Sequence, residues 1–177
     1  MKRLLLFIAT IALVGCGGAP KELTFLGIKV AQPTADFNDH LEALGFEESE
    51  GFLASSGEYM VDVAGVKCVA KHKIFLSNFN LDIHTWEAGN WVVNEQNYLT
   101  LRKALTKELG KPTEIIEDWG ETPPADNAER MRKLHAGDAI YMTVWNNFED
   151  EEQTIGWGVA LYIDGRKVVM EYITPQV

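Results

Sequence analysis

Alternating apolar and polar residues on either side of Ala64-Gly65 constrain the fold of this chain most. Residues 58–63 follow a period of two, and residues 66–71 repeat it. A two-residue turn at Ala64-Gly65 pairs Asp62 with Lys67 and Glu58 with Lys71, so opposite charges meet on the exposed face. The sequence therefore predicts an antiparallel hairpin whose register agrees with its charges. Further strands are expected over residues 73–76 and 81–86.

A first helix is expected after Pro33, with Thr34 as its N-cap. Its apolar face would carry Phe37, Leu41 and Leu44. Gly45 is expected to end it, because glycine readily adopts the positive φ at which helices often stop. A short extended segment over residues 23–28 precedes this helix.

A second helix has the clearest helical period in the chain. Asn94 is expected to cap its start, and Gly110-Lys111-Pro112 to end it. The residues between them place a regular apolar stripe on one side of the helix: Tyr98, Leu101, Leu105 and Leu109.

The last third of the chain is mostly of strand character. Strands are expected over residues 114–119, 139–147, 154–163 and 166–173, with a proline-containing loop after the first of them. Residues 129–134 fit either a helical turn or part of that loop. Asp164-Gly165 is a strong hairpin signal, and as a two-residue turn it would pair Leu161 with Val168 and Trp157 with Tyr172.

This order predicts an α+β fold made of two units, each a helix followed by an antiparallel meander, with the helices packed on antiparallel sheet. Gly45 and Gly110, which end the two expected helices, are 65 residues apart in the sequence. No repeat of individual residues accompanies that spacing, so an internal duplication is a hypothesis only. Residues 23–177 are expected to form one domain.

The N-terminus has the pattern of an export signal. Lys2 and Arg3 precede an apolar run over residues 4–14, which is shorter than the roughly 20 residues that a membrane-spanning helix needs. Leu13-Val14-Gly15-Cys16 then resembles the lipobox of bacterial lipoproteins, in which the cysteine is lipidated and becomes the mature N-terminus. The alternative is an ordinary signal peptide with an incidental cysteine.

The resemblance implies three segments: a signal peptide at 1–15, a tether at 16–22 and the domain at 23–177. The glycine-rich tether would reach only about 15 Å, which keeps the domain close to the membrane. Lipid on Cys16 would be the membrane attachment, in the bacterial cell envelope. Gly17 lacks the acidic character associated in some bacteria with retention in the inner membrane, which favours the outer membrane.

Charge limits the partners. Removal of residues 1–15, which carry two positive charges, changes the formal net charge from −10 to −12. Such an acidic chain repels phosphate backbones, so we expect no nucleic acid among its partners. Once Cys16 is lipidated, Cys68 has no second cysteine in the chain, and it is expected to be buried and unpaired.

The sequence predicts no catalytic residues, no metal site and no cofactor. The four histidines are dispersed, and no zinc or nucleophile motif occurs. Asp82 and His84 alternate on one strand face, which fits a general-base pair or half a metal site but better fits a solvated face. The acidic residues 146–152 offer oxygen ligands for calcium without the glycine of an EF-hand loop, and a charged hairpin loop explains them better.

Aromatic residues supply the candidate binding site. If Ile140, Met142 and Val144 point to the core, then Tyr141 and Trp145 point outward, together with Tyr162 on the neighbouring strand. Exposed aromatic side chains suit a protein, peptide or glycan ligand. In the alternative reading, this face lies under residues 120–134 and the aromatics belong to the core.

The layout also resembles small bacterial lipoproteins of unknown function, through the opening segment Leu23-Thr24-Phe25-Leu26-Gly27-Ile28 and the stop Gly110-Lys111-Pro112. It is more faintly similar to folds like the beta-lactamase inhibitor protein and to small outer-membrane assembly lipoproteins. These resemblances imply a membrane-anchored, non-catalytic binding or assembly module. The alternative is a cell-envelope hydrolase with an unrecognised site.

Overall fold

Eight antiparallel strands form one sheet in the computed structural model, which describes residues 22–49, 57–75, 77–149 and 155–176. The strand order is β3-β4-β5-β6-β10-β9-β8-β7, and a separate two-stranded hairpin joins β1 and β2. The helices and the sheet confirm the predicted α+β class.

The elements follow the chain in two series, each a helix and the strands after it. The described chain begins with the hairpin of β1 Thr24–Phe25 and β2 Ile28–Lys29. The first series follows this hairpin: α1 Thr34–Ala43, β3 Glu47–Glu48, β4 Glu58–Val63, β5 Val66–Phe75 and β6 Asn78–Thr85. The second series runs to the C-terminus: α2 Trp91–Leu109, β7 Glu114–Asp118, α3 Asn127–Ala136, β8 Ile140–Asn146, β9 Gly158–Ile163 and β10 Val168–Pro175.

The two series meet in the middle of the sheet. Each consists of a helix followed by four strands, with α3 added between β7 and β8, and their last strands, β6 and β10, pair with each other. This is the predicted arrangement of two helix-plus-meander units. The hypothesis of an internal duplication stays open.

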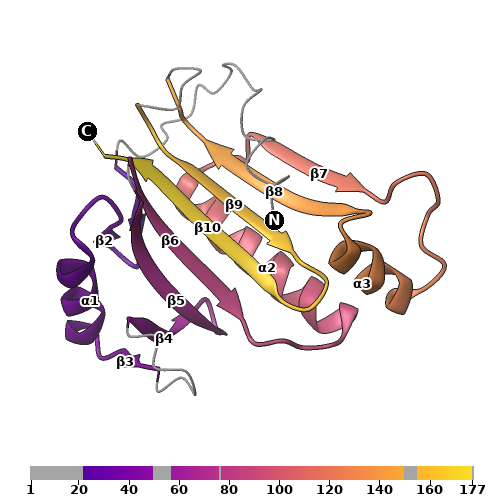
Figure 1. Ribbon diagram of the computed structural model, residues 1–177, viewed down its shortest axis with the longest axis horizontal. Coiled ribbons are helices and arrows are strands. Elements are labelled where there is room, and N and C mark those ends of the chain that lie inside the picture. Colours follow the sequence, from indigo (N-terminus) through magenta and orange to yellow (C-terminus); the bar gives the residue numbers. More distant parts are fainter. Residues whose placement is uncertain (1–21, 50–56, 76, 150–154, 177) are drawn as a thin grey trace.

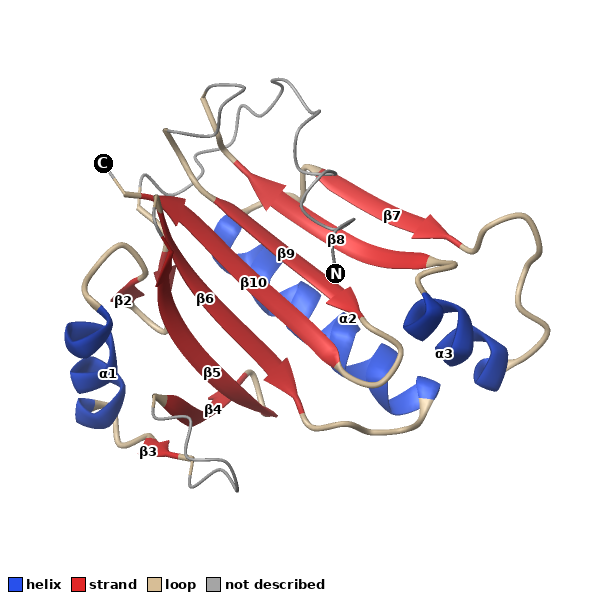
Figure 2. Cartoon of the chain, in the orientation of Figure 1, coloured by secondary structure: helices blue, strands red, loops and turns tan. Residues whose placement is uncertain are grey.

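The helices cover one face of the sheet, which we call the helix face. In Figure 1, α2 runs behind β9 and β10, while α1 lies beside β5 and α3 lies near the start of β8. Figure 2 shows the same two-layer arrangement by element type. Leu81, Leu161 and Met170 on the helix face are fully or almost fully buried, and the stripe of α2 packs on them. The opposite face, here the second face, carries Met142, Ala160 and Tyr162.

The first predicted hairpin is confirmed. β4 and β5 pair with Asp62 opposite Lys67 and Glu58 opposite Lys71. The ion pairs have N–O distances of 3.0 Å and 3.2 Å. Ala64 and Gly65 both have positive φ, as the turn type preferred in two-residue hairpins requires. The predicted strand at residues 73–76 is part of β5, which continues without a break to Phe75.

The predicted register of the last hairpin is wrong by two residues. Val168 pairs with Ile163, and Tyr172 pairs with Val159. The turn is longer because Asp164 caps it: its Oδ1 accepts hydrogen bonds from the backbone N–H groups of Arg166 and Lys167. A shift of two keeps every side chain on its predicted face, since strand side chains alternate with a period of two.

Three helix-end predictions need correction. α2 begins four residues earlier than expected, because the Asn90 side chain caps it by accepting the N–H of Val92, while Asn94 is buried inside the helix. Thr34 is not a cap: it is the first helical residue, and its hydroxyl pairs with His72 Nδ1 at 3.0 Å. Leu44 is 54% exposed, outside the apolar face of α1. Residues 129–134, left open above, belong to α3.

Candidate interaction surface

The predicted aromatic site does not form, because its residues lie on different faces of the sheet. Tyr141 and Trp145 are on the helix face, where Trp145 pairs with Val159 and is 1% exposed. Tyr162 pairs with Met142 on the second face. The prediction assumed that Met142 points to the main core. β8 and β9 are apolar on both faces, so alternation alone could not tell which face the helices cover.

Tyr141 and Trp145 pack against α2. The Tyr141 ring lies edge-on to Trp91, with centroids 5.3 Å apart, and 4.9 Å from Tyr98. Burial raises the pKa of Tyr141 to about 12, and the negative charges of Glu117 and Glu95 add to the shift. The Trp145 indole N–H donates to the carbonyl of Gly110, the residue that ends α2, at 3.0 Å. The alternative reading of these residues as core is therefore correct.

The loop between β7 and α3 contributes only the border of this core. Arg130 of α3 lies over the rings of Trp91 and Trp119, at 5.3 Å and 5.8 Å from their centroids. The ammonium group of Lys133 donates to the carbonyls of Trp119 and Thr122, which fixes the loop on the end of the sheet. α2 supplies the main cover, not the segment 120–134 that the sequence suggested.

Tyr162 belongs to a small cluster on the second face. Its hydroxyl donates to Glu171 Oε1 at 2.8 Å, and its ring packs with Met142, Val144 and Ala160. Burial raises the pKa of both the Tyr162 hydroxyl and the Glu171 carboxyl above their usual ranges. The hydrogen bond satisfies both side chains, so this tyrosine is held within the sheet surface.

The remaining chemical candidates serve the structure. Asp82 binds Lys73, and His84 Nδ1 lies 3.2 Å from the Thr85 carbonyl, so each has a partner other than its neighbour on the strand. Within the described residues, no group of three or more His, Cys, Asp or Glu side chains could hold a metal ion. Cys68 is buried and unpaired as predicted, and burial raises the pKa of its thiol to about 12.

Some predictions fall partly or wholly on residues that the structure does not describe. Cys16 and the whole signal segment lie outside the described residues, as do residues 150–152 of the acidic stretch. The described part of that stretch is hairpin-like: Asn147 N–H bonds to the Trp157 carbonyl, and Glu149 N–H to that of Ile155. No described helix combines the length and hydrophobicity that crossing a membrane requires.

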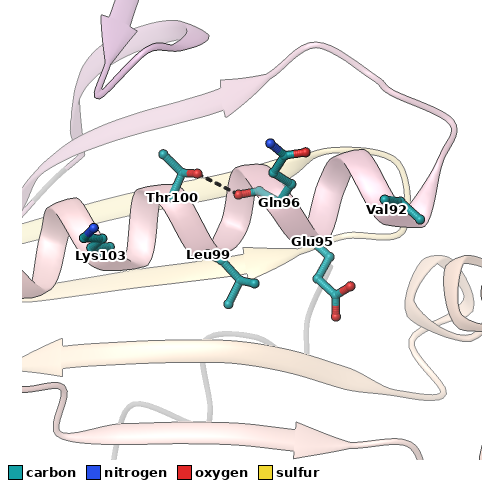
Figure 3. Close-up of a pocket in the computed structure, with 6 residues that line it drawn as sticks. All are labelled: Val92, Glu95, Gln96, Leu99, Thr100 and Lys103. Carbon is teal, nitrogen blue, oxygen red and sulfur yellow. Dashed lines mark hydrogen bonds between the residues drawn. The ribbon is translucent and has the colours of Figure 1, made fainter.

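The outer side of α2 exposes apolar side chains among polar ones, which the sequence did not lead us to expect. A shallow pocket runs along it, lined by six residues from successive turns: Val92, Glu95, Gln96, Leu99, Thr100 and Lys103. Figure 3 shows Glu95 and Leu99 projecting to the same side of the helix. Val92 is 57% exposed and Leu99 43%, although both are large apolar side chains. We call these six residues the α2 outer surface.

A sequence signal for this surface existed. Val92 and Leu99 are seven residues apart, so they share one side of a helix. Neither belongs to the buried stripe, so they lie on a different side of the helix from it. The signal was hidden because the start of α2 was placed at Asn94, which left Val92 outside the expected helix.

One edge of the sheet also exposes an apolar residue. β7 is an edge strand, and its Ile115 is exposed beside the acidic residues Glu114, Glu117 and Asp118. Edge strands present unpaired backbone groups, and charged side chains commonly protect them from pairing with other chains.

Comparison of the chain with models of known protein families, with curated proteins and with solved structures finds no significant match.

Proposed function

We propose that this chain is a lipid-anchored, non-catalytic binding or assembly module of the bacterial cell envelope. The observation that carries the proposal is the signal segment ending in Leu13-Val14-Gly15-Cys16, with its basic start and apolar run. Lipid on Cys16 attaches the protein to the membrane, and the outer membrane is the expected location.

The binding role is supported by the α2 outer surface. Val92 and Leu99 are large apolar side chains exposed on one side of a helix, and an amphipathic helix face is a common docking element. Val92 and Leu99 supply the apolar contact, and Glu95 and Lys103 supply charges of both signs beside it. A protein partner fits this mixture better than a glycan, which would need aromatic platforms.

Metabolic labelling tests the anchor. Cells expressing the full chain are grown with an alkyne-tagged fatty acid, and the purified protein is examined for the label. We expect the wild type to be labelled and Cys16→Ala to lose the label, while Cys68→Ala keeps it as a matched control. Equal labelling of Cys16→Ala, or no labelling of the wild type, would refute the anchor.

A further inference from the structure

The α2 outer surface has a charge pattern that is complementary to itself. Glu95, Leu99 and Lys103 are spaced four residues apart, so they form one ridge along the helix. Leu99 is at the centre of the ridge, with the acid one turn before it and the base one turn after it. A two-fold axis beside Leu99 would place each Glu95 opposite Lys103 of a second copy. A parallel pairing would instead bring like charges together.

Both charges are available for such a pairing. Lys103 is exposed, and within the described residues it forms no ion pair. Glu95 Oε2 accepts the indole N–H of Trp91 at 3.1 Å, which holds the carboxylate in place at the side of the helix. A fixed carboxylate opposite a free lysine loses less conformational entropy on pairing than two mobile side chains would.

We infer that α2 docks antiparallel on α2 of a second copy of this chain, with Leu99 at the two-fold axis and two reciprocal Glu95–Lys103 ion pairs. Antiparallel docking also puts Val92 beside Thr106 of the second copy, once on each side of the axis. The interface is isologous, as in most homodimers: both copies use the same surface, so the dimer is closed and leaves no surface free to bind a third copy.

The dimer rests on the proposed function for its strength. Residues 92–106 span about 21 Å of helix, and one such contact is smaller than the roughly 800 Å² per partner of a standard interface. Free copies would therefore associate weakly. Anchoring both copies to one membrane through Cys16 raises their effective concentration, and binding follows without additional contacts.

Disulfide cross-linking in membranes tests the position of the axis. Full-length Leu99→Cys is expressed, oxidised in isolated membranes and separated on a non-reducing gel. Leu44→Cys is the matched control, because Leu44 is a similarly exposed leucine at the C-cap of α1. We expect a dimer band for Leu99→Cys at several times the level of the control. Equal bands in fatty-acid-labelled protein would overturn the dimer but not the anchor, whereas unlabelled protein would overturn the anchor alone.

Charge exchange tests the pairing, with two tagged full-length chains expressed together and co-purified in mild detergent. Lys103→Glu paired with itself, and Glu95→Lys paired with itself, would each place like charges together. For each we expect co-purification about three- to tenfold below wild type, since two reciprocal pairs change sign.

Lys103→Glu expressed with Glu95→Lys places opposite charges together again and should restore co-purification. Both variants must retain the wild-type circular dichroism spectrum, and because Lys103 is exposed, its variant can be judged even if Glu95→Lys is unstable. Unchanged co-purification for Lys103→Glu, or mixed variants that bind no better than each alone, would overturn the inference. So would cross-linking of Leu99→Cys to a different protein only.

Discussion

Replacement of Trp145 by alanine should strongly destabilise the protein. The side chain is 1% exposed, packs under α2, and donates its indole N–H to the Gly110 carbonyl. Truncation of a buried tryptophan typically costs 3–5 kcal/mol, and loss of the hydrogen bond adds about 1 kcal/mol. For a domain of this size each kcal/mol lowers Tm by about 2–4 °C, so a total cost of about 4–6 kcal/mol should lower Tm by roughly 8–24 °C.

Urea denaturation followed by far-ultraviolet circular dichroism measures the free energy of unfolding, and so the cost in kcal/mol of the replacement. Trp145→Phe should keep most of the packing and lose mainly the hydrogen bond, with a cost of about 1–2 kcal/mol. Trp86→Ala is the matched control: Trp86 is 56% exposed, and its replacement should change the free energy of unfolding by about 0.5 kcal/mol or less. If Trp145→Ala were as mild as Trp86→Ala, Trp145 would be a surface residue and the binding site predicted from sequence would return.

Three further predictions concern the core. Leu105→Asp should cost several kcal/mol, because Leu105 is buried on the side of α2 that packs on the sheet, while Leu99→Asp on the outer side of the same helix should cost about 1 kcal/mol or less. Burial lowers the pKa of His72 in the folded protein. Below pH about 6.5, the usual pKa of histidine, this side chain is therefore protonated more in the unfolded chain than in the folded one, and the stability of the fold decreases as the pH drops. The free energy of unfolding should therefore fall more between pH 7.5 and 5.5 in the wild type than in His72→Gln. Cys68 should react with a thiol reagent only after unfolding, since burial raises its pKa to about 12 and excludes the reagent; fast labelling of the native thiol would show that the site is open.

Local patterns predicted the elements that depend on near neighbours. The β4–β5 register followed from turn chemistry and two charge pairs, which are all within fourteen residues of one another. The buried stripe of α2 followed from its period. These features need no knowledge of the rest of the fold, so the sequence was sufficient for them.

The face of β8 could not be predicted in the same way. Tyr141 and Trp145 alternate with Met142 and Val144, and both sets are apolar. The period of two therefore shows that the sets lie on opposite faces of the strand, but not which set faces the helices. The position of α2 decides which face of β8 is covered, through contacts such as that between Tyr98 Oη and Thr143 Oγ1 at 2.5 Å. These two residues are 45 positions apart in the sequence. At the last hairpin the predicted register was wrong and the predicted faces were right, because a shift of two residues leaves each side chain on the same face.

The acidic edge of the sheet explains why self-association should use α2 and not β7. Antiparallel pairing of two β7 strands about Ile116 would place Glu114 opposite Asp118 of the second copy, twice. Like charges directly opposite each other destabilise a strand pair, so this edge opposes pairing with itself although its Ile115 is exposed. On α2 the same two-fold operation joins Glu95 to Lys103. These two surfaces therefore differ in charge symmetry: of the two, the helix ridge is the one whose charges favour the proposed pairing with a second copy.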